Sequence, residues 1–226
     1  MARHAPEPLQ FEIIPVTPLQ QNCTLLVCPA THAAALVDPG GDVDDIIEVI
    51  ERRGVRLEKI FLTHGHLDHV GGTPALRERY GVPVEGPHLD DRFLIDDLPQ
   101  QGLRFGFPQL QAFTPARWLA GGDTVSFGNV ELQVRHCPGH TPGHVIFFSP
   151  EYRLALVGDV LFAGSIGRTD LPRGDHAALI RSITGQLWPL GQDVTFIPGH
   201  GPTSTFGAER GSNPFVADSV LEHVRH

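Results

Sequence analysis

Four side chains that commonly bind metal ions lie within six residues of one another: His64, His66, Asp68 and His69. They follow a short apolar segment, residues 60–62, which we expect to be a strand. Residues two apart in an extended segment point to the same side, so His64, His66 and Asp68 can share one face. Neutral imidazoles and a carboxylate are suitable ligands for zinc, and also for iron or manganese. The pattern therefore predicts a metal site at the end of this strand.

Three more ligand-type residues have similar surroundings: His140, Asp159 and His200 each follow an expected strand and are framed by glycine or proline. Glycine beside a ligand lets the backbone approach closely and adopt a positive φ. Each of these motifs is weak alone, but with the first cluster they bring the candidate ligands to seven. One metal rarely uses more than four protein ligands, so seven indicate two metal ions.

Apolar segments with the period of strands and helices surround these residues. The first half is expected to contain strands at 11–16, 23–27, 33–37, 59–62 and 82–85, with helices at 43–53 and 74–80. The second half is expected to contain strands at 124–127, 130–136, 145–148, 154–157 and 194–197, with helices at 177–187 and 215–223. The ligand-type residues fall at strand ends, and no linker interrupts the chain. We expect one layered α/β domain over residues 1–226.

Residues 86–118 have the least legible pattern. Asp90, Asp91, Asp96 and Asp97 are interpreted as a solvated helix face. The alternative is that this segment forms a mobile flap over the site. His144, four residues after His140, could orient that ligand, but we do not expect it to.

Composition limits the function classes. Of 226 residues, 41% are hydrophobic, enough for one sizeable core. The balance of 17 basic and 26 acidic residues gives a formal net charge of −9, which argues against a nucleic-acid partner. Three cysteines cannot all pair and are expected to be buried thiols in a reducing compartment. The first 30 residues lack a signal-peptide pattern, and no stretch approaches the ~18 apolar residues of a membrane span. We expect a soluble, cytoplasmic protein.

The order of these sites resembles the metallo-β-lactamase superfamily, whose signature is His-x-His-x-Asp-His followed by a third histidine, a bridging aspartate and a last histidine. The resemblance extends from the Asp38-Pro-Gly-Gly turn to His200. It implies a four-layer αββα sandwich of two similar halves. It also implies one metal held by His64, His66 and His140, a second held by Asp68, His69 and His200, and a bridging Asp159, with Asp68 and Asp159 as the catalytic carboxylates.

Within the superfamily, the aspartate at the bridging position and the intact Asp68 and His69 resemble the glyoxalase II group. Residues 167–175 and 209–215 are similar to segments of its short bacterial members. The implied reaction is hydrolysis of a small-molecule thioester, S-2-hydroxyacylglutathione (S-lactoylglutathione), to the acid and free thiol. Two divalent ions, zinc first and iron or manganese as alternatives, would activate water and polarise the carbonyl. The thiolate leaving group, with a thiol pKa of about 8.5, departs without a general acid.

Glutathione recognition is expected to be incomplete. By the resemblance, Arg168 takes the basic position that holds the peptide of glutathione, and we interpret it as the substrate-binding residue. Asp170 and Pro202 stand where the family has tyrosines. We therefore expect a high KM for glutathione thioesters and acceptance of other thiol carriers.

Other functions remain open at this point. Persulfide dioxygenases resemble the chain too, and in that reading a single iron would be held by His64, His140 and Asp159. A metal-binding structural or interaction protein is a third class. Hydrolysis of β-lactams or lactones and RNA processing are minor alternatives, and the negative charge disfavours the last of them.

Overall fold

Two β-sheets lie face to face in the computed structural model, which describes residues 8–107 and 110–224. The first sheet has the order β1 (Gln10–Val16), β2 (Gln21–Val27), β3 (Ala33–Val37), β4 (Arg56–Phe61) and β5 (Val84–Glu85). β1, β2 and β3 pair antiparallel, whereas β3, β4 and β5 run parallel. All five residues of β3 are buried, as expected for a small apolar strand covered on both faces.

The second sheet has the order β13 (Ser204–Thr205), β12 (Thr195–Pro198), β9 (Leu154–Gly158), β8 (Val145–Ser149), β7 (Val130–His136) and β6 (Thr124–Phe127). Its pairs are antiparallel except for β9 and β12. β6 and the start of β7 alternate buried and exposed residues, because one face of this hairpin meets the other sheet and one meets solvent. A small ribbon of β10 (Leu161–Phe162) and β11 (Ser165–Ile166) follows β9.

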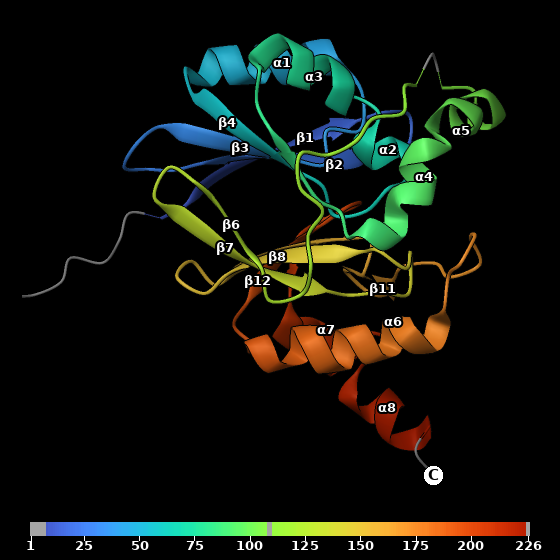
Figure 1. Cartoon of the computed structure of the whole chain (residues 1–226). Helices are drawn as coiled ribbons and strands as arrows, with labels where there is room; N and C mark the ends of the chain where they lie inside the picture. The colour runs from blue at the N-terminus through green and yellow to red at the C-terminus, as the bar shows by residue number, and fades with distance from the viewer. Residues whose placement is uncertain (1–7, 108–109, 225–226) are drawn as a thin grey trace, which may run out of the picture.

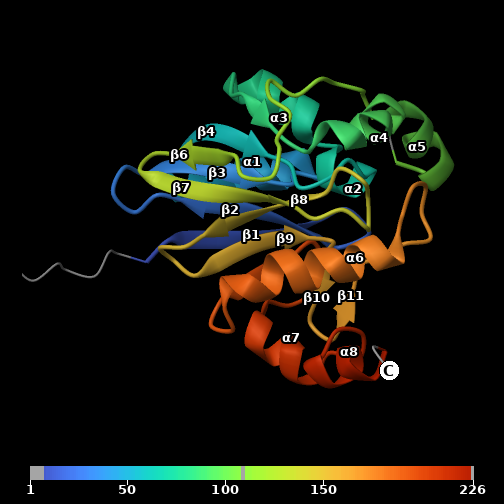
Figure 2. The same ribbon diagram turned by 60° about the horizontal axis from the view of Figure 1, so that its bottom comes forward.

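Helices cover the outer face of each sheet (Figures 1 and 2). α1 (Val43–Arg53) and α3 (Thr73–Tyr80) lie on the first sheet, and α6 (His176–Ser182), α7 (Phe206–Ser212) and α8 (Asp218–Val224) lie on the side of the second. α1 buries Ile46 and Ile50, one turn apart, at about 1.5–3 kcal/mol for each side chain, and ends at Gly54 in the left-handed region.

Three apolar layers hold the sandwich together. One lies between the first sheet and its helices, one between the two sheets, around Phe61 and Phe147, and one between the second sheet and its helices, around Leu179 and Phe196. Four layers of elements separated by three apolar layers form an αββα sandwich, so the predicted fold class is confirmed.

The C-terminal elements differ from the predicted ones. The helix expected at 177–187 is α-helical only to Ser182 and continues as a π-helical turn, η2 (Ile183–Leu187), and a 3-10 turn, η3 (Trp188–Leu190). The last helix begins at Asp218, and α7 was not expected at all. Two glycines weaken the helical pattern of α7, while the Thr205 hydroxyl caps it by accepting a hydrogen bond from the Ala208 N–H.

The region 86–118 carries a 3-10 turn, η1 (Leu89–Asp91), and two short helices, α4 (Arg92–Asp96) and α5 (Leu98–Phe105). Asp90 and Asp96 are exposed, as predicted, but Asp91 is fully buried, so the interpretation of all four aspartates as a solvated face was wrong. Residues 108–109 lie outside the described part, and the mobility of this segment stays a prediction.

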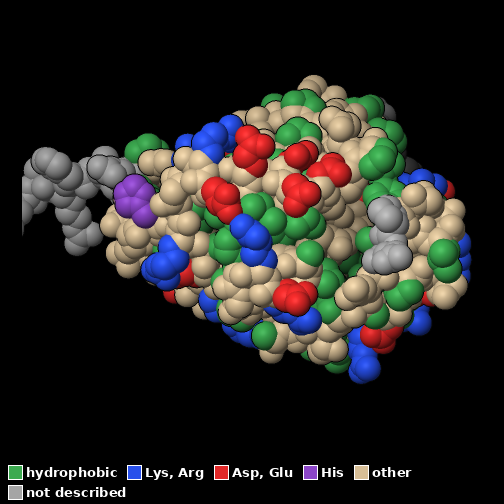
Figure 3. Space-filling view, turned by 90° about the horizontal axis from the view of Figure 1, so that it is seen from above, with side chains coloured by type: hydrophobic (Ala, Val, Ile, Leu, Met, Phe, Trp, Pro, Cys, Tyr) green, Lys and Arg blue, Asp and Glu red, His purple; other side chains and the backbone are tan. Residues whose placement is uncertain are grey.

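The outer face over α1 and α3 has interspersed acidic and basic side chains in Figure 3. One ion pair there joins Arg79 to Glu51 at 2.7 Å. Among the described residues, no helix is both long and apolar enough to cross a bilayer.

Candidate metal centre

Three histidine nitrogens converge where the loop after β4 meets the loop after β7. His66 Nδ1 lies 3.1 Å from His64 Nε2 and 2.9 Å from His140 Nε2. His64 and His140 are buried, and His66 is half-buried at the rim. Atoms so close and so oriented can face one cation.

A second cluster forms beside the first. After His66 the chain turns into a single helical turn, α2 (Leu67–Val70), which brings Asp68 and His69 to the same side. Asp68 Oδ2 lies 3.2 Å from His200 Nε2 and 3.8 Å from His69 Nε2. These three ligand atoms, two from α2 and one from the loop after β12, can face another cation.

Asp159, at the end of β9, lies between the two clusters. Its Oδ2 is 3.5 Å from His140 Nε2 and 3.7 Å from His200 Nε2, while its Oδ1 is 3.4 Å from His69 Nε2. One carboxylate thus faces both histidine groups. The structure brings all seven residues predicted as ligands into one centre.

The residues fit divalent metal ions. Among the residues that the structure describes, His69 Nε2 and Asp159 Oδ1 are buried side-chain atoms without a hydrogen-bond partner. Such an atom costs about 1–3 kcal/mol if nothing satisfies it. Both point into the centre, where a cation would satisfy them. The imidazole and carboxylate donors suit zinc, iron or manganese.

Of the five histidines among the candidate ligands, four are held by the ring nitrogen that faces away from the centre. The Nδ1 atom of His64 lies 3.0 Å from Thr63 Oγ1, and that of His69 lies 2.9 Å from Asp38 Oδ2. The other two face backbone carbonyls: His140 Nδ1 lies 2.8 Å from Arg168 O, and His200 Nδ1 lies 3.1 Å from Leu19 O. When Nδ1 donates to these acceptors, Nε2 carries a lone pair toward the centre, which is the tautomer a metal requires.

Burial and charge divide the histidines into two electrostatic groups. Burial lowers the pKa of His66 to about 3 and that of His64 well below its ordinary value, so both are neutral. Burial also acts to lower the pKa of His69, but Asp159 and Asp68 outweigh it and raise that pKa. Burial acts to raise the pKa of the Asp159 carboxyl, but His69, His140 and His200 together outweigh it and lower that pKa.

Asp38 is a buried residue of the centre whose role sequence reasoning missed. Its Oδ1 accepts a hydrogen bond from the Thr63 N–H at 2.7 Å, and its Oδ2 accepts from Thr63 Oγ1 at 2.5 Å and from His69 Nδ1 at 2.9 Å. The side chain therefore fixes the start of the histidine loop and the orientation of His69. It belongs to the Asp38-Pro-Gly-Gly turn, which was already a recognisable motif.

His144 also orients the centre, contrary to expectation. Its ring stacks on His64 with centroids 4.7 Å apart, and its Nε2 accepts a hydrogen bond from the Asp159 N–H at 3.1 Å. His144 thus packs against one predicted ligand and holds the backbone of another.

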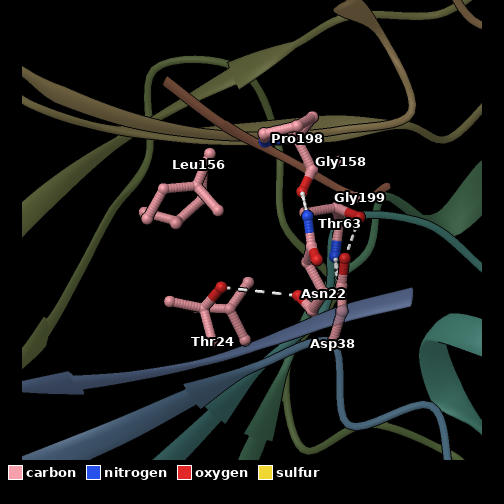
Figure 4. Close-up of a pocket in the computed structure, with 10 residues that line it drawn as sticks. Asn22, Thr24, Asp38, Thr63, Leu156, Gly158, Pro198 and Gly199 are labelled. Carbon is pink, nitrogen blue, oxygen red and sulfur yellow. Dashed lines mark hydrogen bonds between the residues drawn. The ribbon is translucent and has the colours of Figure 1, made fainter. Parts of the chain in front are cut away.

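The His200 loop is held by Asn22 from β2. The Asn22 N–H donates to Gly199 O at 2.7 Å, and its side-chain Nδ2 donates to Pro198 O at 3.0 Å and Gly201 O at 2.8 Å. Figure 4 shows Asn22 beside Asp38 at a cavity of about 10 Å³ next to the centre. A cavity of that size has room for about one water molecule.

Glycine is required at position 199, beside the Asp159 carboxylate. A Cβ at Gly199 would lie 2.1 Å from Asp159 Oδ1 and 2.6 Å from His69 Cε1. This close approach explains the Pro-Gly-His order in the last ligand motif.

Arg168, the predicted substrate-binding residue, is exposed and paired. Its Nε donates to Asp170 Oδ1 at 2.7 Å and its Nη2 to Asp170 Oδ2 at 2.6 Å. Its backbone carbonyl accepts the hydrogen bond from His140, which places the residue at the edge of the centre.

The family model described as the metallo-beta-lactamase superfamily matches residues 16–206. This chain belongs to the metallo-β-lactamase superfamily. It is 46% identical over 209 residues to the hydroxyacylglutathione hydrolase GloC of Haemophilus influenzae, covering 92% of this chain and 98% of the relative.

Two solved structures are similar to this superfamily member. BLEG-1 B3 metallo-beta-lactamase has a TM-score of 0.85 and 35% identity, over 92% of this chain and 99% of that one. TTHA1623, solved in a di-iron-bound form, has a TM-score of 0.83 and 36% identity, over 91% of this chain and 100% of that one.

Proposed function

We propose that this protein is a binuclear metal hydrolase that cleaves thioesters, with S-2-hydroxyacylglutathione as the substrate class. The observation that carries the proposal is Asp159, which faces two separate groups of histidines within 3.7 Å. The 46% identity to a hydroxyacylglutathione hydrolase over nearly its whole length supports the choice of substrate.

The ligands divide into two sites. His64, His66 and His140 form the first site, Asp68, His69 and His200 form the second site, and Asp159 bridges them. Zinc is the first choice for both, with iron or manganese as alternatives, and a similar protein is known in a di-iron form. When bound, two such ions activate a water near neutral pH and polarise the substrate carbonyl.

The chain's own carboxylates match a leaving group that needs no proton. Burial acts to raise the pKa of Asp68 and Asp159, but neighbouring histidines, His69 first, lower both. These carboxylates are therefore ionised at neutral pH and cannot donate a proton. A thiolate, with a thiol pKa of about 8.5, leaves without one, whereas an amine from an amide does not.

Arg168 is proposed to contact the peptide part of glutathione. Its side chain is exposed at the rim, on the residue whose carbonyl orients His140. A substrate carboxylate would have to compete with Asp170 for the guanidinium. That competition would weaken the binding of glutathione and favour the acceptance of other thiol carriers.

The one-iron dioxygenase is less well supported. It would use His64, His140 and Asp159 and would leave the second site without a role. Yet Asp68 and His200 lie 3.2 Å apart there, and His69 Nε2 is buried without a partner among the described residues. Because persulfide dioxygenases keep the same histidine pattern, the ligand atoms alone do not separate the two functions, and the 46% identity to a hydroxyacylglutathione hydrolase is what favours the hydrolase.

The proposal is tested by comparing a thioester series with amides of the same acyl group. We expect rates that increase as the pKa of the leaving thiol falls, and almost no turnover of the amides, because Asp68 and Asp159 are ionised and cannot protonate a departing amine. Comparable turnover of an amide would contradict the assignment and indicate a proton donor in the site.

A further inference from the structure

Asp91 is a fully buried carboxylate in η1, outside the seven candidate ligands. Its Oδ2 accepts hydrogen bonds from the Gly65 N–H at 2.9 Å and from Thr141 Oγ1 at 2.8 Å. Its Oδ1 accepts one from the Gly143 N–H at 2.6 Å. A single side chain thus receives three hydrogen bonds, two of them from backbone groups.

The partners of Asp91 belong to the two loops that carry the first site. Gly65 lies between His64 and His66, and Thr141 directly follows His140. The two loops are about 75 residues apart in sequence and come from opposite sheets. Asp91 therefore connects the two halves of the molecule, through the loops that carry the three histidines of the first site.

Two glycines let the histidine loops approach Asp91 and its neighbour α4 closely. A Cβ at Gly143 would lie 2.7 Å from Asp91 Oδ1, and a Cβ at Gly65 would lie 2.8 Å from the Leu94 Cβ of α4. Both loops therefore approach the 86–105 segment as closely as glycine permits. All three partners donate, so two acceptor oxygens are needed, and an amide at this position would turn one of its ends toward a donor.

We propose that Asp91 is a positioning residue that fixes the spacing of the His64–His66 loop and the His140 loop, and thereby sets the metal affinity of the first site. The inference rests on the proposed metal centre. Outer residues that orient metal ligands typically change metal affinity about 10–100-fold when they are replaced. The second site, whose ligands Asp91 does not contact, should keep its affinity.

Asp91→Asn is the direct variant, because it keeps the size of the side chain and removes one acceptor. Thr141→Val removes one of the three hydrogen bonds and keeps the shape of the threonine. It provides a milder second test if Asp91→Asn does not fold. Asp90→Asn is the matched control, since Asp90 is the exposed neighbour in the same 3-10 turn.

The first measurement is amide hydrogen exchange in the metal-free protein. Asp91→Asn should speed exchange at Gly143 or Gly65, whose N–H groups donate to the carboxylate, while Asp90→Asn should leave both unchanged. The second measurement is stepwise zinc titration against a chromophoric chelator. One of two affinities should fall about 10–100-fold in Asp91→Asn, and by less in Thr141→Val.

Unchanged exchange at both glycines together with unchanged zinc affinities would overturn the role of Asp91. So would an equal loss in Asp90→Asn. Failure of the proposed function is a separate result: wild-type protein that binds zinc but does not hydrolyse thioesters would refute that function, while the exchange and affinity data would still decide the role of Asp91.

Discussion

Replacing Asp38 by asparagine should weaken the second site through the tautomer of His69. Asp38 Oδ1 accepts from the Thr63 N–H and Oδ2 from His69 Nδ1, and the aspartate is 2% exposed. The asparagine oxygen can replace only one of these acceptors. If it stays with Thr63, the amide NH₂ faces His69 Nδ1 and drives the imidazole proton to Nε2, the atom that should bind metal.

The opposite amide orientation is less favourable. It would place the NH₂ group against the Thr63 N–H and leave a buried donor unsatisfied, at a cost of about 1–3 kcal/mol. In the first orientation the Thr63 hydroxyl, which donates to Oδ2 in the wild type, can rotate and accept from the NH₂ group, and His69 changes its tautomer. We therefore expect a 10–100-fold loss of metal affinity at the second site, equivalent to roughly 1.4–2.8 kcal/mol.

Backbone strain does not complicate this substitution. Asp38 has φ 52°, in the left-handed region that asparagine tolerates well. Asp42→Asn is a matched control, because Asp42 also has a positive φ, 43°, but its carboxylate accepts from the Thr17 N–H instead of a histidine. Chelator competition in metal titrations measures both affinities. Equal affinities in Asp38→Asn and wild type, or an equal loss in Asp42→Asn, would refute the reasoning.

Three further substitutions test the centre from other sides. Asp159→Asn should remove activity and at least one metal, as measured by elemental analysis, whereas Asp96→Asn, on an exposed face, should do neither; equal losses would reject the bridging role. Asn22→Ala should lower the free energy of unfolding of the metal-free protein in urea by about 1–3 kcal/mol, because the buried Pro198 carbonyl loses a donor. Unchanged stability would mean that the His200 loop does not depend on the Asn22 side chain. Arg168→Ala should raise KM a few-fold for a glutathione thioester and less for a short neutral one, since only the first has carboxylates; equal KM changes would show that the side chain shapes the loop.

The elements with a strong local pattern were predictable. Residues 33–37 form an apolar run bounded by turns, and β3 has those bounds. α7 was missed because Gly207 and Gly211 weaken its pattern, and only its capping threonine marked it. The change from α- to π-helix after Ser182 has no simple signal in the residue types.

The candidate ligands were predictable because each is a metal-binding residue type in the loop or turn that follows an apolar strand. The residues that hold them were not. Asp91 lies in an acidic stretch that resembles a solvated face, and two of its three partners are backbone N–H groups of glycines 26 and 52 residues away. Asn22 likewise donates to carbonyls about 180 residues further along the chain. Backbone partners leave no trace in the side-chain sequence, so only the fold reveals these contacts.

The central claim is that two metals act in one site. It is tested most directly by titrating zinc into metal-free protein while following the hydrolysis of S-lactoylglutathione. The account predicts that activity rises until two equivalents per chain are bound and falls to background when Asp159 is replaced by asparagine. Full activity at one equivalent, or metal binding without thioester hydrolysis, would contradict it.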